Sequence, residues 1–301
     1  LAAAPPERPR AGGEPPVGSS ANVADVTVAP LDTPAPDATG LLTPAETGLP
    51  RDLWAGSRGE GVAAQLRRFP VAALPAVQAQ LREILLAGLD PPGRGAADGT
   101  LFLARVDALL ARGAVPEAAE LLRRAGTGRP AHLRRAFDAA LLMGQEDAGC
   151  AAMRAAPRLG ASFPVRIFCL ARTGDWAAAA LTLETAVALG ELTEAQDRLL
   201  ARFLDPELAE MGAPLPPPGR PTPLAFRMLE AIGEPLPTAG LPLAFAHADL
   251  RRTAGWKARL EAAERLARAG ALPAERLFAI YAERRPAASG GVWDRVEAVQ
   301  A

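Results

Sequence analysis

The chain has 301 residues, of which 49% are hydrophobic and only 5% aromatic, and its formal net charge is −1 at pH 7. This length suffices for one large or two modest domains, with a core built mainly from alanine, leucine and valine. The near-zero net charge argues against a general nucleic-acid binder. The chain has no run of 18 apolar residues, so we predict no membrane span.

Residues 1–40 are rich in Pro, Ala, Gly, Asp and Thr and contain few large apolar side chains. Such a segment cannot bury enough apolar surface to offset the entropy lost on ordering, so we predict a disordered tether over residues 1–40. The chain begins at Leu1, and LAAAPPERPR is typical of the sequence that follows a removed signal peptide. We therefore expect a bacterial protein located in the periplasm, with the cytoplasm as the alternative.

Residues 41–92 are predicted to form an N-terminal helical cap. Thr43 followed by Pro44 is a helix-start signal, and GVAAQLRRF and LPAVQAQLREILLAG carry apolar residues at helical spacing. A stacked helical array needs such a cap at its end. We interpret Trp54 as a core anchor of this segment.

Three copies of one pattern occupy residues 101–130, 131–159 and 162–190, within a predicted repeat region over 93–213. Each copy is an apolar-periodic run, a glycine, a few polar residues and a second apolar-periodic run, which predicts a helix, a tight turn and a helix. A repeat of about 30 residues corresponds to one helical hairpin in a stacked array. The three turn glycines are Gly113, Gly144 and Gly174.

When the copies are superposed on these glycines, small residues and large apolar residues recur at fixed offsets. Small residues allow the two helices of a hairpin to approach closely, and large ones fill the layer between hairpins. Five residues after the glycine stand Ala118, Gly149 and Ala179, and twelve after it stand Ala125, Ala156 and Ala186. Large residues stand nine after it, at Leu122, Met153 and Leu183, and eleven before it, at Phe102, Leu133 and Phe163.

This pattern, closed by Pro130 in the first copy, resembles the tetratricopeptide (TPR) repeat. The period is shorter than the usual 34 residues, and the closing proline is displaced to Pro157 in the second copy and absent from the third. The resemblance covers about 90 residues. It implies an all-α protein, an α-solenoid whose first helices line a concave face where extended peptides bind.

Residues 214–301 are predicted to form a second helical segment, which begins in the proline-rich stretch 211–223. A helical hairpin is expected around Gly270. Val292, Trp293 and Val296 share one face of the last predicted helix. We expect this face to need residues beyond Ala301 to complete its packing.

Motifs for catalysis or cofactor binding are missing from the sequence. It has no P-loop, GxGxxG, GxSxG or HExxH motif, and His132 and His247 are its only histidines. Cys150 and Cys169 belong to no metal-binding pattern, and we predict buried free thiols rather than a disulfide. The sequence therefore predicts a protein that is not an enzyme and uses no metal or cofactor.

Function is then argued from the predicted surface. Arg105 and Arg166 stand eight residues before their turn glycines, and Arg135 stands nine before its own. We hypothesise that these arginines form a row on the concave face and bind an acidic, extended segment of a partner protein. The alternative is ordinary solvated surface. Trp176, in the third turn, is expected in the core.

The sequence thus predicts a non-catalytic helical-repeat scaffold that binds a partner protein in the bacterial cell envelope. The alternative is an accessory or superhelical part of an envelope enzyme, such as a lytic transglycosylase acting on peptidoglycan. Those enzymes also carry long alanine-rich helical regions. Their catalytic domain has a Glu-Ser pair, and this chain contains no Glu-Ser dipeptide.

Overall fold

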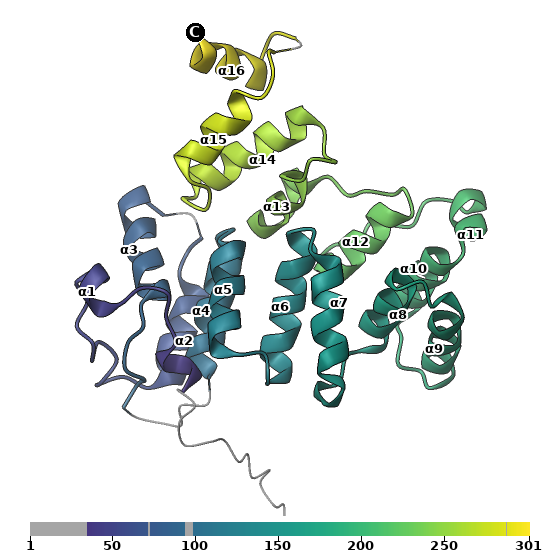
Figure 1. The fold of residues 1–301 in the computed structure, drawn as a ribbon, viewed down its shortest axis with the longest axis horizontal. Helices are drawn as coiled ribbons and strands as arrows, with labels where there is room; N and C mark the ends of the chain where they lie inside the picture. Colours follow the sequence, from purple (N-terminus) through teal and green to yellow (C-terminus); the bar gives the residue numbers. More distant parts are fainter. Residues whose placement is uncertain (1–34, 72, 94–98, 287) are drawn as a thin grey trace, which may run out of the picture. The chain divides into compact units, whose positions relative to one another are not determined.

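The computed structural model describes residues 35–71, 73–93, 99–286 and 288–301 (Figure 1). In this part of the chain the regular secondary structure is helical and no strand is formed, apart from an isolated bridge between Leu42 and Ala87. The prediction of an all-α protein is confirmed. Alanine and leucine, which dominate the apolar content, are among the residues that most favour helices. No helix of the described residues is long and apolar enough to cross a membrane.

The first helices pack on the first hairpin, in the position predicted for a cap. They are α1 (Pro44–Thr47), α2 (Gly59–Arg68) and α3 (Pro75–Leu86). Thr43 caps α1 as predicted, since its side chain accepts from the Glu46 N–H while the Glu46 carboxylate accepts from the Thr43 N–H. Leu81, Leu85 and Leu86 of α3 are buried in one cluster with the first hairpin. Trp54 is only half-buried and lies outside that cluster.

Three helical hairpins follow, and their turns share one geometry. The glycine N–H donates to the carbonyl three residues back, and the next N–H donates to the carbonyl five residues back. In the first turn these bonds are Gly113 to Leu110, 3.0 Å, and Ala114 to Leu109, 2.9 Å. This arrangement requires one residue with a left-handed backbone conformation, which glycine adopts readily. The glycines are Gly113 (φ +76°), Gly144 (φ +73°) and Gly174 (φ +83°).

Each hairpin consists of two helices of similar length on either side of its glycine. The pairs are α4 (Thr100–Ala111) with α5 (Val115–Ala125), α6 (Pro130–Leu142) with α7 (Glu146–Ala155), and α8 (Phe163–Arg172) with α9 (Trp176–Ala188). The predicted small residues lie at the helix–helix contacts. Ala118 and Ala179 are fully buried. A Cβ at Gly149 would stand 3.1 Å from the Phe137 ring.

Residues 192–231 extend the same core. The helices are α10 (Glu194–Leu204), α11 (Pro206–Met211) and α12 (Pro223–Ala231). The segment between α11 and α12 is non-helical, as its prolines predict. However, α12 packs against α6 and α10, and its Leu224, Met228 and Leu229 are buried in the core of the second and third hairpins. The predicted boundary after residue 213 therefore does not separate two cores.

A second core is formed by α13 (Ala246–Asp249), α14 (Trp256–Arg268), α15 (Ala274–Tyr281) and α16 (Val292–Gln300). Val296 is fully buried, and the Trp293 ring packs on the Trp256 ring with centroids 5.2 Å apart. The face of the last helix that we expected to lack a partner thus packs against α14 and α15.

The C-terminal segment closes over the first two hairpin turns and leaves the third open. His247 Nε2 lies 2.6 Å from the Gly113 carbonyl oxygen. A Cβ at Gly113 would stand 2.8 Å from a Leu266 methyl, and one at Gly144 would stand 2.7 Å from Arg251 Cδ. At Gly174 nothing lies within 4 Å. Of these three turns, the third is the one that no described residue covers.

The predicted tether spans residues 1–40, and residues 1–34 lie outside the described residues. Residues 35–40 are part of the fold, which corrects the tether's predicted end. The Asp37 carboxylate is buried and accepts from the backbone N–H groups of Gly99 (3.2 Å) and Phe102 (2.7 Å) at the start of α4. A carboxylate there satisfies the free N–H groups of the helix and its positive dipole end, and this orders the segment.

Candidate functional site

The predicted row of three arginines is broken at Arg105. Its side chain is 1% exposed and is surrounded by backbone carbonyls. Its Nε donates to Leu85 O, Nη2 to Ala87 O, and Nη1 to Thr39 O, at 2.7–2.9 Å. Arg105 therefore ties α3 and the 37–39 segment to α4, and it does not reach a surface where a partner binds.

The other two predicted arginines differ from Arg105 and from each other. Arg135 is half-buried and forms two hydrogen bonds with the Asp107 carboxylate, at 2.6 and 2.8 Å. Arg166 is exposed, and its guanidinium lies 5.7 Å from the centroid of the Phe163 ring. The partner-binding role proposed for Arg135 and Arg166 stays a prediction. Arg166 is the one of the three that is exposed.

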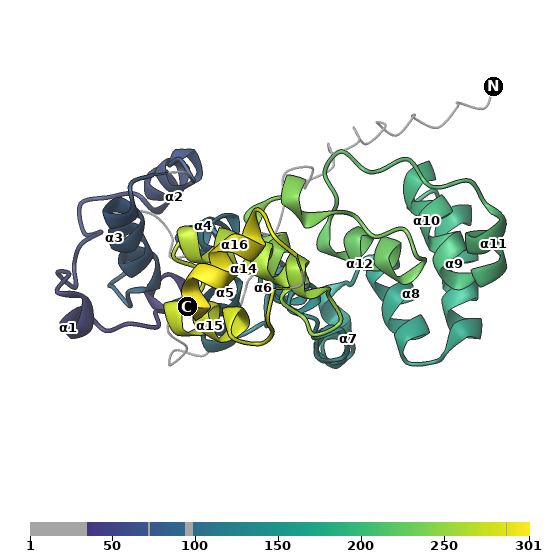
Figure 2. The ribbon, with the colours of Figure 1, turned by 90° about the horizontal axis from the view of Figure 1, so that it is seen from above.

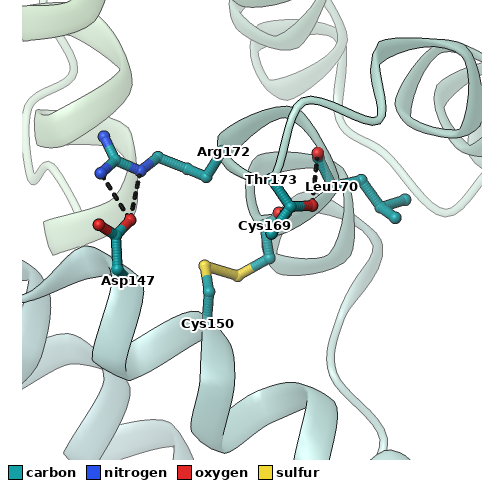
Figure 3. The surroundings of a disulfide bond; sticks show 6 residues. All are labelled: Asp147, Cys150, Cys169, Leu170, Arg172 and Thr173. Carbon is teal, nitrogen blue, oxygen red and sulfur yellow. Dashed lines mark hydrogen bonds and ion pairs between the residues drawn. A yellow bond between two sulfur atoms is a disulfide. The ribbon is translucent and has the colours of Figure 1, made fainter.

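Cys150 and Cys169 form a disulfide between α7 and α8, with Cα atoms 5.3 Å apart (Figure 3). The prediction of free thiols was wrong. The sequence places the cysteines on successive hairpins, where they could face each other, but it does not fix the distance between them; the packing of α7 against α8 brings the two within bonding range. Next to the disulfide, Asp147 accepts a hydrogen bond from Arg172 at 2.7 Å (Figure 3). Asp147 stands three residues before Cys150, and Arg172 stands three after Cys169.

On the other side of the disulfide, a groove lies between α7 and α8. Its volume is about 590 Å³, and its lining is largely apolar, with Met153, Val165 and Leu170. Arg154 and Arg166 lie on its two walls. Among the described residues, no carboxylate oxygen lies within 4.0 Å of either guanidinium. The groove therefore combines an apolar lining with two positive charges that lack a counter-charge.

The outward face of α9 is the second feature of this hairpin. Its large apolar side chains are highly exposed: Trp176 53%, Leu181 65%, Val187 47% and, just past the helix end, Leu189 64%. The expectation that Trp176 is a core residue was wrong, because no described segment covers the third turn. Helix α9 packs on α8 and α10 through its other side (Figure 2).

One exposed apolar position of α9 is charged in the first hairpin. Seven residues after the turn glycine, α5 has Glu120, which pairs with Arg123 at 2.6 Å, where α9 has Leu181. Ten residues after the glycine both helices are charged, with Arg123 on α5 and Glu184 on α9. The exposed Leu181 is thus not a feature that the first and third hairpins share.

The sequence analysis missed Arg154 and the α9 face, although the sequence carries a signal for the second. The chain has 33 basic residues, yet no lysine or arginine occurs between Arg172 and Arg198. A helix surface without basic residues in so arginine-rich a chain, with large apolar side chains at several of its positions, favours a covered surface. The groove carries no comparable signal, because it depends on how α7 meets α8.

A second cleft, of about 330 Å³, lies between α6, α8 and the first residues of α12. Of the described residues that line it, Asp138 is the only carboxylic acid. Burial raises the pKa of Asp138 to about 6, against the opposing effect of the Arg134 and Arg135 charges. A single acid without a second acid–base group does not form a catalytic pair, so we assign no chemistry to this cleft.

The two histidines serve the fold. Nδ1 of His132 lies 3.0 Å from the Gly126 carbonyl oxygen, and His247 contacts the first hairpin turn as described above. Burial lowers the pKa of both rings, so both are neutral at pH 7. Within the described ranges no three His, Cys, Asp or Glu side chains are grouped so as to hold a metal ion.

Comparison with known proteins adds no relative, since no protein-family model, no curated protein and no solved structure matches this chain. Its class is therefore defined by its own architecture. It is an all-helical protein in which successive hairpins share one turn geometry. The groove and the exposed apolar side chains described above lie on α7, α8 and α9.

Proposed function

We propose that the protein is a non-catalytic helical-repeat scaffold that binds a partner protein through its third hairpin. The observation that carries this proposal is the set of large apolar side chains exposed on α9, with Leu181 where α5 has the charged Glu120. Exposed large apolar side chains gathered on one helix are characteristic of a protein interaction site. Trp176 is of the residue type that most often dominates the binding energy at such sites.

The occupant we propose is the apolar face of a helix of another protein. The exposed apolar side chains are spread along the length of α9, and a second helix packs against a helix surface at an axial distance of about 8–10 Å. Burying an exposed apolar side chain completely contributes about 1.5–3 kcal/mol, and these side chains are already about half covered. Their combined contribution is then a few kcal/mol.

The repeat part of the proposal is supported by the turns. The pair of hydrogen bonds that closes the three hairpins also closes the helices before three further glycines: Gly190, Gly233 and Gly270. A recurring hairpin with a fixed turn is the unit of TPR-like α-solenoids, which present extended binding surfaces. We therefore propose the TPR-like solenoid as the architecture of the hairpin region.

The location we propose is the bacterial cell envelope, in the periplasm. The Cys150–Cys169 disulfide supports this, because disulfides persist in oxidising compartments and are rare in the cytosol.

The experiment is site-specific photo-crosslinking in cells of the source organism. A photoreactive amino acid is placed at Leu181, and in a matched control at Glu120, the equivalent position of the first hairpin. The proposal expects a discrete adduct with another protein from position 181 and none from position 120. The adduct's partner is then purified, and Leu181→Arg should weaken its binding to the full chain by about tenfold or more.

Two results would contradict this proposal. The first is the same adduct pattern from both positions, which would make α9 ordinary surface. The second is an adduct formed only with a second copy of the chain, together with a dimer in light scattering. That result would assign the α9 face to self-association.

A further inference from the structure

We infer that the groove between α7 and α8 binds a carboxylate of an extended segment of the partner protein, with an apolar side chain next to that carboxylate inserted in the groove. This inference rests on the proposed function and adds to it a second contact site and its chemistry. The residues that carry it are Arg154 and Arg166 on the walls, and Met153, Val165 and Leu170 in the lining.

The register of the two antiparallel helices indicates that the groove would accept a negatively charged group. On one side of the disulfide, Asp147 faces Arg172 and the two form an ion pair. On the other side, Arg154 stands four residues after Cys150, and Arg166 stands three before Cys169. Here the interface places two positive charges across one groove. Like charges held close together are unfavourable, and an anion between them reverses the sign of that interaction.

The geometry of the arginines suits a carboxylate. A guanidinium donates in a planar fork that matches the two oxygens of a carboxylate, and two such groups satisfy both oxygens. Arg166 is already oriented, because its guanidinium lies over the Phe163 ring. The disulfide holds the two walls together, although α7 and α8 otherwise share fewer contacts than the helices within either hairpin.

The apolar lining determines what accompanies the carboxylate. In an extended segment successive residues advance about 3.3 Å and point to opposite sides, so a carboxylate and an apolar side chain enter one groove when they stand two residues apart. Met153 and Leu170 offer an apolar surface, and Met adapts to side chains of different shapes. The fitting ligand is therefore an acidic segment with large aliphatic residues two positions from its aspartates.

The test uses the full chain and a fluorescein-labelled eight-residue peptide in which Asp-Ser-Leu-Ser occurs twice, so that aspartate and leucine point to the same side. Binding is measured by fluorescence anisotropy at low and high salt. We expect a dissociation constant below about 1 mM that rises with salt, as exposed charge contacts require. The same peptide with asparagine in place of aspartate should bind at least about tenfold more weakly, because it lacks the charge-assisted bonds.

Variants of the groove are compared with a matched control. The double variant Arg154→Ala with Arg166→Ala should weaken binding by at least about tenfold, while Arg252→Ala, an exposed arginine of the C-terminal segment, should leave it unchanged. The single variants should each show a smaller loss. Circular dichroism and melting temperature verify that each variant is folded, which exposed arginines allow.

Several outcomes would overturn the inference. They are no binding of the acidic peptide below about 1 mM, equal binding of the asparagine peptide, or unchanged binding by the double variant. Binding of octanoate in this groove without binding of the peptide would assign it to a small anionic amphiphile instead.

The failure of this inference and of the proposed function can be distinguished. Leu181→Arg should leave peptide binding unchanged, because Leu181 lies on the outward face of α9 and does not line the groove. If the crosslinked partner binds equally well to the double arginine variant, only the groove inference fails. If the peptide binds through both arginines but position 181 captures no partner, only the α9 proposal fails.

Discussion

Replacing the buried Arg105 by methionine should destabilise the protein strongly. Methionine retains an unbranched apolar stem but removes the charge and all five donors. Four backbone carbonyls then lose a partner, since the guanidinium also donates to Asp37 O at 3.2 Å, besides Leu85, Ala87 and Thr39. These carbonyls come from two segments, so the variant should loosen both α3 and residues 37–39 from α4.

The magnitude follows from these bonds. A buried acceptor left without a donor costs about 1–3 kcal/mol, and losing one member of a buried charged network typically costs about 3–5 kcal/mol. Part of this loss is offset because the folded protein no longer holds a desolvated charge. Burial lowers the pKa of Arg105 to about 10, which shows that desolvation penalty. We expect a net loss of about 3–4 kcal/mol in the free energy of unfolding.

Urea denaturation followed by circular dichroism measures this loss. Arg166→Met is the matched control, because Arg166 occupies the same position of the repeat but is exposed, and its loss should be within about 1 kcal/mol. Arg105→Lys should fall between the two, since one ammonium cannot span carbonyls of both segments. If Arg105→Met lies within about 1 kcal/mol of the wild type, the carbonyl network does not stabilise the fold as argued.

Three further predictions concern other sites. Ala179→Leu should overpack the fully buried α8–α9 contact and cost about 1–3 kcal/mol, so an unchanged melting temperature would contradict the close approach there. Replacing Cys150 and Cys169 together by serine should lower the free energy of unfolding by about 3 kcal/mol under oxidising conditions. Dithiothreitol should lower the stability of the wild type to that of the variant, and a wild type insensitive to dithiothreitol would argue against the disulfide. Asp138→Asn should stabilise the protein by roughly 1–3 kcal/mol at pH 8, because the folded-state pKa of about 6 exceeds the usual 3.8 and ionising the buried acid opposes folding. That gain should vanish by about pH 4, where Asp138 is protonated in the folded protein, and a gain equal at both pH values would contradict burial as its cause.

Local features of the fold were predictable from the sequence because they depend on neighbours in the chain. The Gly113, Gly144 and Gly174 turns need one left-handed residue and hydrogen bonds within six residues, and glycine marks that requirement. The contact residues Ala118 and Ala179 followed from the same frame, since the two helices of a hairpin are joined by its turn.

The environment of a repeat position was not predictable in this way. Arg105 and Arg166 occupy the same place in the repeat, yet one is enclosed by carbonyls and the other lies on an open groove. The difference is made by residues 35–40 and α3, which cover the first hairpin and have no counterpart over the third. Periodicity describes how a helix presents its own residues, and it carries no information about which distant segment covers them.

The sequence by itself therefore determined the helical class, the hairpins and their turns, since each results from helix propensity and short-range hydrogen bonding. The tertiary structure decided which surfaces are open. It paired Cys150 with Cys169, buried Asp37 against the start of α4, and left the outward face of α9 uncovered. These outcomes depend on contacts between segments that are distant in the chain. Several helices have similar apolar faces, so the sequence of one helix does not determine which other helix it packs against.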